Sequence, residues 1–312
     1  MNEIPAKLRE NLTRVIVGKD DTVEMLIAAV LAGGHILLED APGTGKTTLA
    51  LALSRSLGLR FRRLQLTPDT VASDITGYSA YDQAKESFVY HPGAAMTDLL
   101  LADELNRTSG KTQSALLEAM EEGRLTVDGI TYDLPRCFTV IATQNPVGAA
   151  GTSAIPLSQL DRFMVQLHLG APDKESLKRI LADRAEADPL DGAEQVCTGE
   201  ELEEIRAEIR KVSMSDEMTD YVCDIWQAIA DSPHTETGIS PRGALALCRI
   251  ARAGAYLDGR DYVVPSDIRA CFLPVCAHRL VLTREAKAAG KTAEQVLSAL
   301  LKAIPCPDNK GL

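Results

Sequence analysis

One short stretch, Glu39–Thr47, constrains what this chain can fold into more than any other part of it. An apolar run at residues 36–38 precedes it and predicts a buried strand. Residues 48–57 follow, and they predict a helix because leucines recur four apart, at Leu49, Leu53 and Leu57. A strand, a glycine-bearing loop and a helix N-terminus in this order direct loop N–H groups and the positive end of a helix dipole at one place. We therefore expect a phosphate-binding loop here.

The residue types inside the loop fit a nucleoside triphosphate. Gly43 and Gly45 would allow close backbone approach to the phosphates. Lys46 would reach the β- and γ-phosphates, and the Thr47 hydroxyl would ligate Mg²⁺. A solvated turn that arose by chance is the alternative. The expected nucleotide site also includes Ala41, Pro42, Thr44 and Thr48.

Asp40 and the pair Val17-Gly18 also bear on the expected nucleotide site. Asp40 stands where the P-loop pattern has a glycine. Aspartate tolerates unusual backbone angles better than most residues, so we expect the turn to survive. Upstream, Val17 and Gly18 would pack against the nucleotide base; a turn that merely links two helices is the alternative reading.

A second chemical landmark is the acidic pair Asp103 and Glu104. An apolar run at residues 99–102 precedes the pair and predicts a parallel strand covered on both faces. The pair would then lie at the carboxyl edge of an open α/β sheet, where ligands bind. Adjacent strand residues point to opposite faces. One of the two carboxylates can therefore hold the Mg²⁺ shell while the other faces the attacking water; two acidic residues that merely begin a loop are the alternative.

Two more elements complete the predicted α/β part. Residues 125–132 predict a β-hairpin, because Asp128-Gly129 lies between β-branched residues. Residues 138–143 predict another buried strand, followed directly by Gln144 and Asn145. Asn145 would reach the same sheet edge as Asp103 and orient the lytic water or touch the γ-phosphate; an Asn-Pro turn is the alternative.

The chain changes character near Pro172. Before it, apolar runs and hairpin signals dominate; after it, apolar residues recur at helical spacing, as in residues 202–212 and 218–229. Ser240-Pro241 starts a helix to about residue 257. Residues 287–301 predict a further helix. We predict an α/β domain at residues 1–170 and an α-helical domain at 171–312.

Composition narrows the classes of protein. The formal net charge is -11, which argues against a sequence-independent DNA binder. The seven cysteines show no zinc spacing and fit a reducing cytosol; Cys223 and Cys248 are expected to be buried. Residues 1–5 are neither basic nor apolar, and the longest uncharged apolar stretch, 25–38, is too short to span a bilayer. We expect a cytoplasmic protein without membrane insertion.

The ordered set of motifs resembles an AAA+ ATPase, and four stretches are similar to the MoxR family in particular: Gln65–Asp69, Ser73–Gly77, Ala102–Arg107 and Lys111–Glu122. The resemblance covers residues 15 to about 280. It implies an AAA+ P-loop core with a parallel sheet and an all-α lid. Residues 67–93 would be the insertion within helix 2, and residues 125–134 the pre-sensor 1 hairpin. An acidic residue at the position of Asp40 is familiar in this family.

The resemblance also implies catalytic roles. Asp103 would be Walker B and Glu104 the catalytic base. Asn145 would be sensor 1, and Arg242 would be sensor 2, which reaches the nucleotide from the helical lid. Arg162 looks like an arginine finger that enters the site of the neighbouring subunit. The alternative for Arg162 is a surface arginine that pairs with Asp161.

Members of the MoxR family are described as ring-forming, chaperone-like ATPases. The resemblance implies ATP and Mg²⁺ as ligands, a homo-oligomer in the form of a hexameric ring, and a client protein. It also implies a partner that carries a von Willebrand factor A domain. A metal-chelatase or cofactor-insertion motor, a nucleic-acid-linked motor and a non-hydrolysing scaffold are alternatives. A nucleic-acid-linked motor would need a basic ring lumen, and Lys85 is the one basic residue in 67–90, which argues against that alternative.

Overall fold

A five-stranded parallel sheet organises the first half of the protein. The computed structural model describes residues 3–307 apart from 42, 146–151, 153 and 187. The strand order is β2-β5-β8-β1-β9, and each neighbouring pair is parallel. The bounds are β1 Ile36–Glu39, β2 Phe61–Gln65, β5 Leu99–Asp103, β8 Thr139–Gln144 and β9 Val165–Leu167. All five carboxyl ends therefore meet at one edge of the sheet, and all five amino ends meet at the other.

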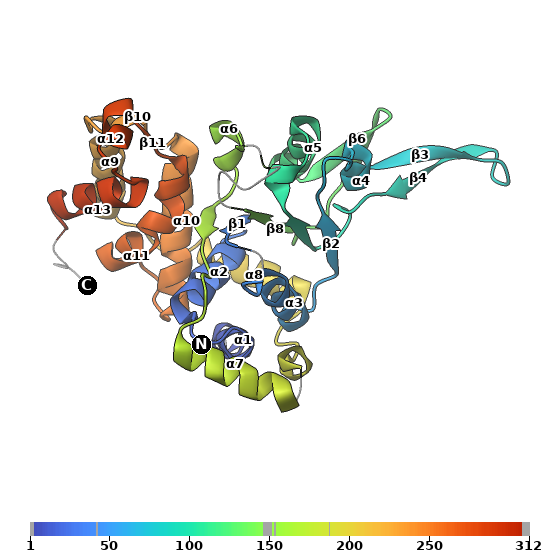
Figure 1. Ribbon diagram of the computed structural model, residues 1–312, viewed down its shortest axis with the longest axis horizontal. Helices are drawn as coiled ribbons and strands as arrows, with labels where there is room; N and C mark the ends of the chain where they lie inside the picture. The colour runs from blue at the N-terminus through green and yellow to red at the C-terminus, as the bar shows by residue number, and fades with distance from the viewer. Residues whose placement is uncertain (1–2, 42, 146–151, 153, 187, 308–312) are drawn as a thin grey trace.

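Both faces of this sheet are covered, as the apolar runs predict. Alternate strand residues enter two different cores: Ile36 and Leu99 contribute to one, whereas Leu37 and Leu100 contribute to the other. In Figure 1, helices α1 (Ile4–Val15), α2 (Asp20–Leu31) and α3 (Lys46–Ser56) lie on one side of the sheet. Helix α5 (Gly110–Glu122) lies on the other side, and the 3₁₀ turn η1 (Leu105–Arg107) leads into it.

Two antiparallel hairpins stand outside the sheet. The predicted pre-sensor 1 hairpin is β6 (Arg124–Val127) with β7 (Ile130–Asp133). The insertion expected at residues 67–93 holds regular structure of its own. It forms α4 (Ala72–Thr76) and a hairpin of β3 (Gly77–Asp82) with β4 (Ser87–Pro92), which extends far from the body in Figure 1. The rings of Tyr90 and Tyr132 stack with centroids 4.0 Å apart, so the two hairpins touch.

Helices dominate the second half of the chain. They are α6 (Leu157–Leu160), α7 (Lys174–Glu186), α8 (Gly199–Ile209), α9 (Asp216–Ala230), α10 (Pro241–Leu257), α11 (Pro265–Cys276), α12 (Arg284–Ala288) and α13 (Ala293–Ala303), with 3₁₀ turns η2 (Pro189–Gly192) and η3 (Ala277–Arg279). A two-stranded ribbon of β10 (Thr235–Thr237) and β11 (Val281–Leu282) is added to the expected helices. The predicted boundary at residue 170 stays a prediction; beyond it, α8 packs against α2 of the α/β part.

Two local expectations were wrong. The helix predicted over 287–301 is broken into α12 and α13, because Gly290 adopts a left-handed φ of 70° and Thr292 caps the second helix. Cys223 is exposed and Cys248 is partly exposed, so neither behaves as a fully buried apolar residue. In the described part of the chain, every helix is too short or too polar to cross a bilayer.

The histidine just before β1 makes stability depend on pH. His35 accepts a hydrogen bond at Nδ1 from Val140 N–H (3.0 Å) and lies 3.1 Å from Met120 O through Nε2. Burial lowers the pKa of His35 to about 4. In the unfolded chain, the imidazole has its ordinary pKa of about 6.5. Between about pH 4 and pH 6.5, the unfolded chain therefore binds more protons than the folded chain. Stability is therefore lost as the pH falls through this window.

We expect the denaturant midpoint of the parent to fall between neutral pH and about pH 4.5. His35→Gln keeps a neutral donor and acceptor in place, so its midpoint should fall less over the same range. Urea unfolding of both proteins at several pH values measures the difference in slope. Parallel pH profiles for the two proteins would show that His35 does not titrate on unfolding.

Candidate functional site

The loop after β1 has the backbone of a phosphate cradle. Gly43 and Gly45 both adopt left-handed φ angles, 87° and 93°, which side chains with a Cβ rarely adopt. The Thr44 hydroxyl donates to Ala41 O (3.2 Å) and closes the turn. Helix α3 begins immediately after, at Lys46, so its first N–H groups and its dipole face the loop. Thr47 and Thr48 lie in this first helical turn, and Pro42 lies outside the described residues.

Lys46 folds back over the loop. Its Nζ donates to the carbonyl oxygens of Asp40 (2.6 Å) and Ala41 (3.2 Å). Burial lowers the pKa of Lys46, while the negative charges of Asp40, Asp103 and Glu104 act in the opposite direction. The ammonium group therefore lies within electrostatic reach of the acidic pair, as expected for one phosphate site.

Asp40 has a structural role that its position in the motif did not reveal. Its φ is not positive, so a left-handed backbone is not the reason for this residue. Instead, its carboxylate accepts hydrogen bonds from the backbone N–H groups of Leu169 (2.6 Å) and Gly170 (2.9 Å), just beyond β9. Asp40 thus ties the start of the phosphate loop to the edge strand of the sheet.

The acidic pair lies at the end of β5, as predicted. The Thr143 hydroxyl donates to Asp103 Oδ1 (2.6 Å) and accepts from the backbone N–H of Glu104 (2.8 Å). Glu104 adopts a left-handed φ of 60°, which is costly for a residue with a Cβ and is concentrated at functional sites. This turn, rather than strand alternation, separates the two carboxylates. Arg63 pairs with Asp103 (2.6 Å), and Arg107 pairs with Glu104 (3.0 Å).

Asn145 follows β8, the strand between β5 and β1. It therefore lies between the acidic pair and the phosphate loop along the carboxyl edge. Asn106 binds both backbone groups of Asn145: its Nδ2 donates to Asn145 O (3.0 Å), and its Oδ1 accepts from Asn145 N–H (3.3 Å). Sequence reasoning did not single out Thr143 or Asn106, although both are polar residues directly beside the two strand ends that it identified.

The segment before α2 also reaches this edge. Val17 is buried, and Gly18 has a left-handed φ of 73°. A Cβ at Gly18 would come within 2.1 Å of Ser176 Oγ, and one at Gly45 would lie 3.8 Å from Ile16 Cδ1. The loop that carries Val17 and Gly18 therefore packs beside the phosphate loop, where a nucleotide base could contact it.

Arg162 and Arg242 lie away from the phosphate loop, beside Glu121 of α5. Arg162 directly precedes β9, at the amino edge of the sheet, and both arginines pair with Glu121 near the end of α5. The neighbouring Met120 contacts His35, which precedes β1, so Glu121 is at this edge too. The four residues of β1 place about 13 Å between the edges. The structure thus brings the two arginines together but does not bring Arg242 to the phosphate loop of its own chain.

A buried ion pair sets the position of these arginines. Arg279 is 2% exposed at its side chain and donates from Nε to Asp161 Oδ1 (2.8 Å). The other carboxylate oxygen of Asp161 accepts from Ser240 (2.8 Å), the N-cap of α10. Asp161 is therefore engaged by the helical part, and the alternative pairing of Arg162 with Asp161 was wrong. The network joins the segment that carries Arg162 to the helix that carries Arg242.

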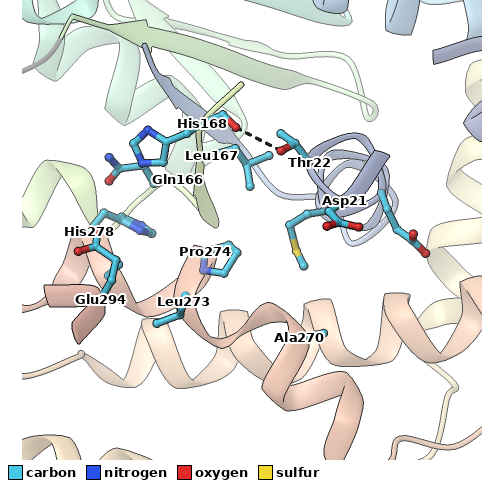
Figure 2. Close-up of a pocket in the computed structure, with 13 residues that line it drawn as sticks. Asp21, Thr22, Gln166, Leu167, His168, Ala270, Leu273, Pro274, His278 and Glu294 are labelled. Carbon is cyan, nitrogen blue, oxygen red and sulfur yellow. Dashed lines mark hydrogen bonds between the residues drawn. The ribbon is translucent and has the colours of Figure 1, made fainter. Parts of the chain in front are cut away.

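Two hollows differ in charge. One hollow, of about 620 Å³, lies between the start of α2, the end of β9 and helices α11 and α13, and Figure 2 draws the residues that line it. Its charged lining residues are acidic: Asp21, Glu24 and Glu294. A second hollow, of about 350 Å³ at the amino edge, is lined by Arg162, Arg242, Arg249 and Arg279 against Glu121 and Asp161. The second hollow, with its excess of cations, is the one suited to an anion.

The hydrogen bonds from Leu169 and Gly170 to the Asp40 carboxylate can be tested by substitution. Asp40→Asn places an amide against one of two backbone N–H groups, and we expect the free energy of unfolding to fall by about 1–3 kcal/mol. Weaker nucleotide binding should accompany this loss, because the loop is no longer held to β9. Urea unfolding and titration with a fluorescent nucleotide measure both effects. Asp224→Asn, on an exposed face of α9, is the control; equal effects of the two substitutions would remove the special role of Asp40.

Comparisons with known proteins agree with this geometry. Residues 35–165 match the ATPase family associated with various cellular activities (AAA), and residues 227–300 match the AAA lid domain. The chain is 43% identical to the uncharacterized protein YeaC of Bacillus subtilis, over 98% of this chain and 96% of that one. It is 36% identical to chaperone MoxR1 of Mycobacterium tuberculosis, over 94% and 80%. The crystal structure of an ATPase candidate from Cytophaga hutchinsonii superposes with a TM-score of 0.89, at 34% identity over 98% and 96% of the chains. The chain therefore belongs to the MoxR family of AAA+ ATPases.

Proposed function

We propose that this protein is a ring-forming, chaperone-like ATPase that uses ATP hydrolysis to remodel a client protein, together with a partner that carries a von Willebrand factor A domain. One observation supports the ring most directly. The phosphate loop and the acidic pair occupy the carboxyl edge of the sheet, whereas Arg162 and Arg242 occupy the amino edge. In this proposal, the full set of charges around one ATP would come from two copies of the chain.

The carboxyl edge would bind ATP and prepare the water. Lys46 would exchange its two carbonyl partners for the β- and γ-phosphates. The Thr47 hydroxyl and the Asp103 carboxylate are hard oxygen donors, which suit Mg²⁺, and the ion would neutralise phosphate charge when bound. Glu104 would align the attacking water and accept its proton. Asn145, held through its backbone by Asn106, would help to orient that water.

The amino edge would act on the neighbouring subunit. Arg162 and Arg242 would then stabilise negative charge on the γ-phosphate of the ATP bound next door. This assignment revises the expectation for Arg242: it would serve as a sensor for the neighbour's nucleotide rather than its own. Catalysis of this kind is mostly positioning and charge stabilisation, so a monomer would be nearly inactive.

The two hairpins would transmit the nucleotide state to the client. Near the far end of the β3–β4 hairpin, Phe88 is 74% exposed and Tyr81 is 56% exposed. At its base, Tyr90 stacks on Tyr132 of the β6–β7 hairpin. Helix α5, which carries Glu121, leads directly into β6. A movement of α5 would therefore reach both hairpins and the exposed aromatic side chains.

The role of Glu104 is directly testable. Glu104→Gln keeps the shape of the side chain but cannot accept the proton, so we expect ATP binding to persist and turnover to be lost. Equilibrium binding of a fluorescent ATP analogue and phosphate release measure the two steps separately. Glu118→Gln, on the exposed face of α5, should leave both unchanged. Turnover of Glu104→Gln at the parental rate would remove Glu104 from the mechanism.

The shared site predicts a dependence on assembly. Specific activity at saturating ATP should climb with protein concentration as subunits associate. Arg162→Ala should lower kcat by on the order of 10³–10⁵ and leave nucleotide affinity nearly intact. Arg179→Ala, on exposed helix α7, provides the control. A flat activity profile across the range in which the measured mass changes would contradict a site built from two copies.

A further inference from the structure

We propose that Glu121 is a positioning residue, which gathers Arg162 and Arg242 of its own chain into one clamp for the phosphates bound by the neighbouring subunit. The inference rests on the proposed shared site. It adds a residue that touches neither the nucleotide nor the water in this arrangement, and that acts through the two arginines.

The carboxylate of Glu121 has both oxygens engaged. Oε2 lies 3.0 Å from Arg162 Nη1, and Oε1 accepts a hydrogen bond from Arg242 Nη2. The same Arg162 nitrogen also donates to Leu117 O (2.6 Å), one turn earlier in α5. A single side chain therefore aligns an arginine of the α/β part with an arginine of the helical part. Neither arginine comes from α5 itself, so this contact adds a direct link between the two side chains to the one that Arg279 and Asp161 make between their segments.

Both guanidinium groups keep donors available. A guanidinium carries five N–H donors, and each arginine uses one nitrogen on Glu121. In the described part of the chain, Arg162 Nη2 and Arg242 Nη1 have no hydrogen-bond partner, and the buried Arg162 Nε has none either. An incoming phosphate could therefore bind both arginines while Glu121 continues to hold them.

Charge explains why a carboxylate is needed at this position. Two guanidinium groups repel each other, and the hollow around them is also lined by Arg249 and by Arg279. Asp161 is engaged by Arg279 and Ser240, so it does not offset the charge of Arg162 and Arg242. Glu121 neutralises about one of the two charges and leaves a net cationic hollow, which is suited to an anion from outside the chain.

A mixing experiment separates the two sides of the shared site. The donor chain carries Lys46→Ala, which disables its phosphate loop and keeps its arginines. The acceptor chain carries Arg162→Ala and Arg242→Ala, which remove the clamp and keep the phosphate loop. Each chain alone should be nearly inactive. Mixed rings should hydrolyse ATP where a donor arginine pair faces an acceptor phosphate loop.

Glu121→Gln is then introduced into either the donor chain or the acceptor chain of the mixture. In the donor chain it should lower kcat of the mixture by on the order of 10- to 100-fold, the loss expected for a hydrogen bond to a charged group, with little change in KM. In the acceptor chain it should have no effect. Glu121→Asp in the donor keeps the charge and should restore part of the rate. Glu122→Gln, the neighbouring residue that pairs with Arg124, is the matched control.

Three outcomes would overturn the inference. Parental activity with Glu121→Gln in the donor would show that Glu121 does not position the clamp. Equal losses in donor and acceptor, with a shift in oligomer mass, would assign Glu121 to assembly alone. An inactive mixture of the donor and acceptor chains, in which mixed rings form and the acceptor chain binds fluorescent nucleotide, would overturn the shared site itself. This last result is obtained before Glu121 is altered. A failure of the shared site can therefore be told apart from a failure of the proposed role of Glu121.

Discussion

The common direction of the five central strands is the constraint on which the rest of the structure depends. Parallel pairing brings the ends of β1, β5 and β8 to one edge, and with them the phosphate loop, the acidic pair and Asn145. The same rule sends the residues that precede β9, including Arg162, to the opposite edge. The sheet thereby separates the phosphate loop and the acidic pair from Arg162 and its partner Glu121.

Short polar contacts hold each edge in shape. At the carboxyl edge, Thr143 bridges Asp103 and the backbone of Glu104, and Asp40 ties the phosphate loop to the residues after β9. At the amino edge, the buried pair of Arg279 and Asp161 joins the helical part to the segment before β9. A buried charge that loses its partner is costly, so this pair resists independent movement of the two parts.

This arrangement links assembly to chemistry in the proposed function. A subunit presents its arginines on a face that its own nucleotide does not reach, so contact between copies would switch hydrolysis on. Glu121 lies in α5, and α5 leads into the hairpin whose Tyr132 stacks on Tyr90. A single helix therefore connects the arginines to the exposed aromatic side chains of the long hairpin.

Local sequence signals determined much of the α/β part. The glycines of the phosphate loop, the apolar runs of the buried strands and Asp128-Gly129 act over a few residues, so their structures were predictable without the fold. The insertion hairpin and the break at Gly290 were missed, because polar segments and single glycines carry weak periodicity. Only the tertiary structure decided that Asp40 binds beyond β9, that Arg279 occupies Asp161, and that Glu121 gathers Arg162 and Arg242. These contacts join residues up to 130 positions apart, and no local pattern encodes which distant charge a side chain meets.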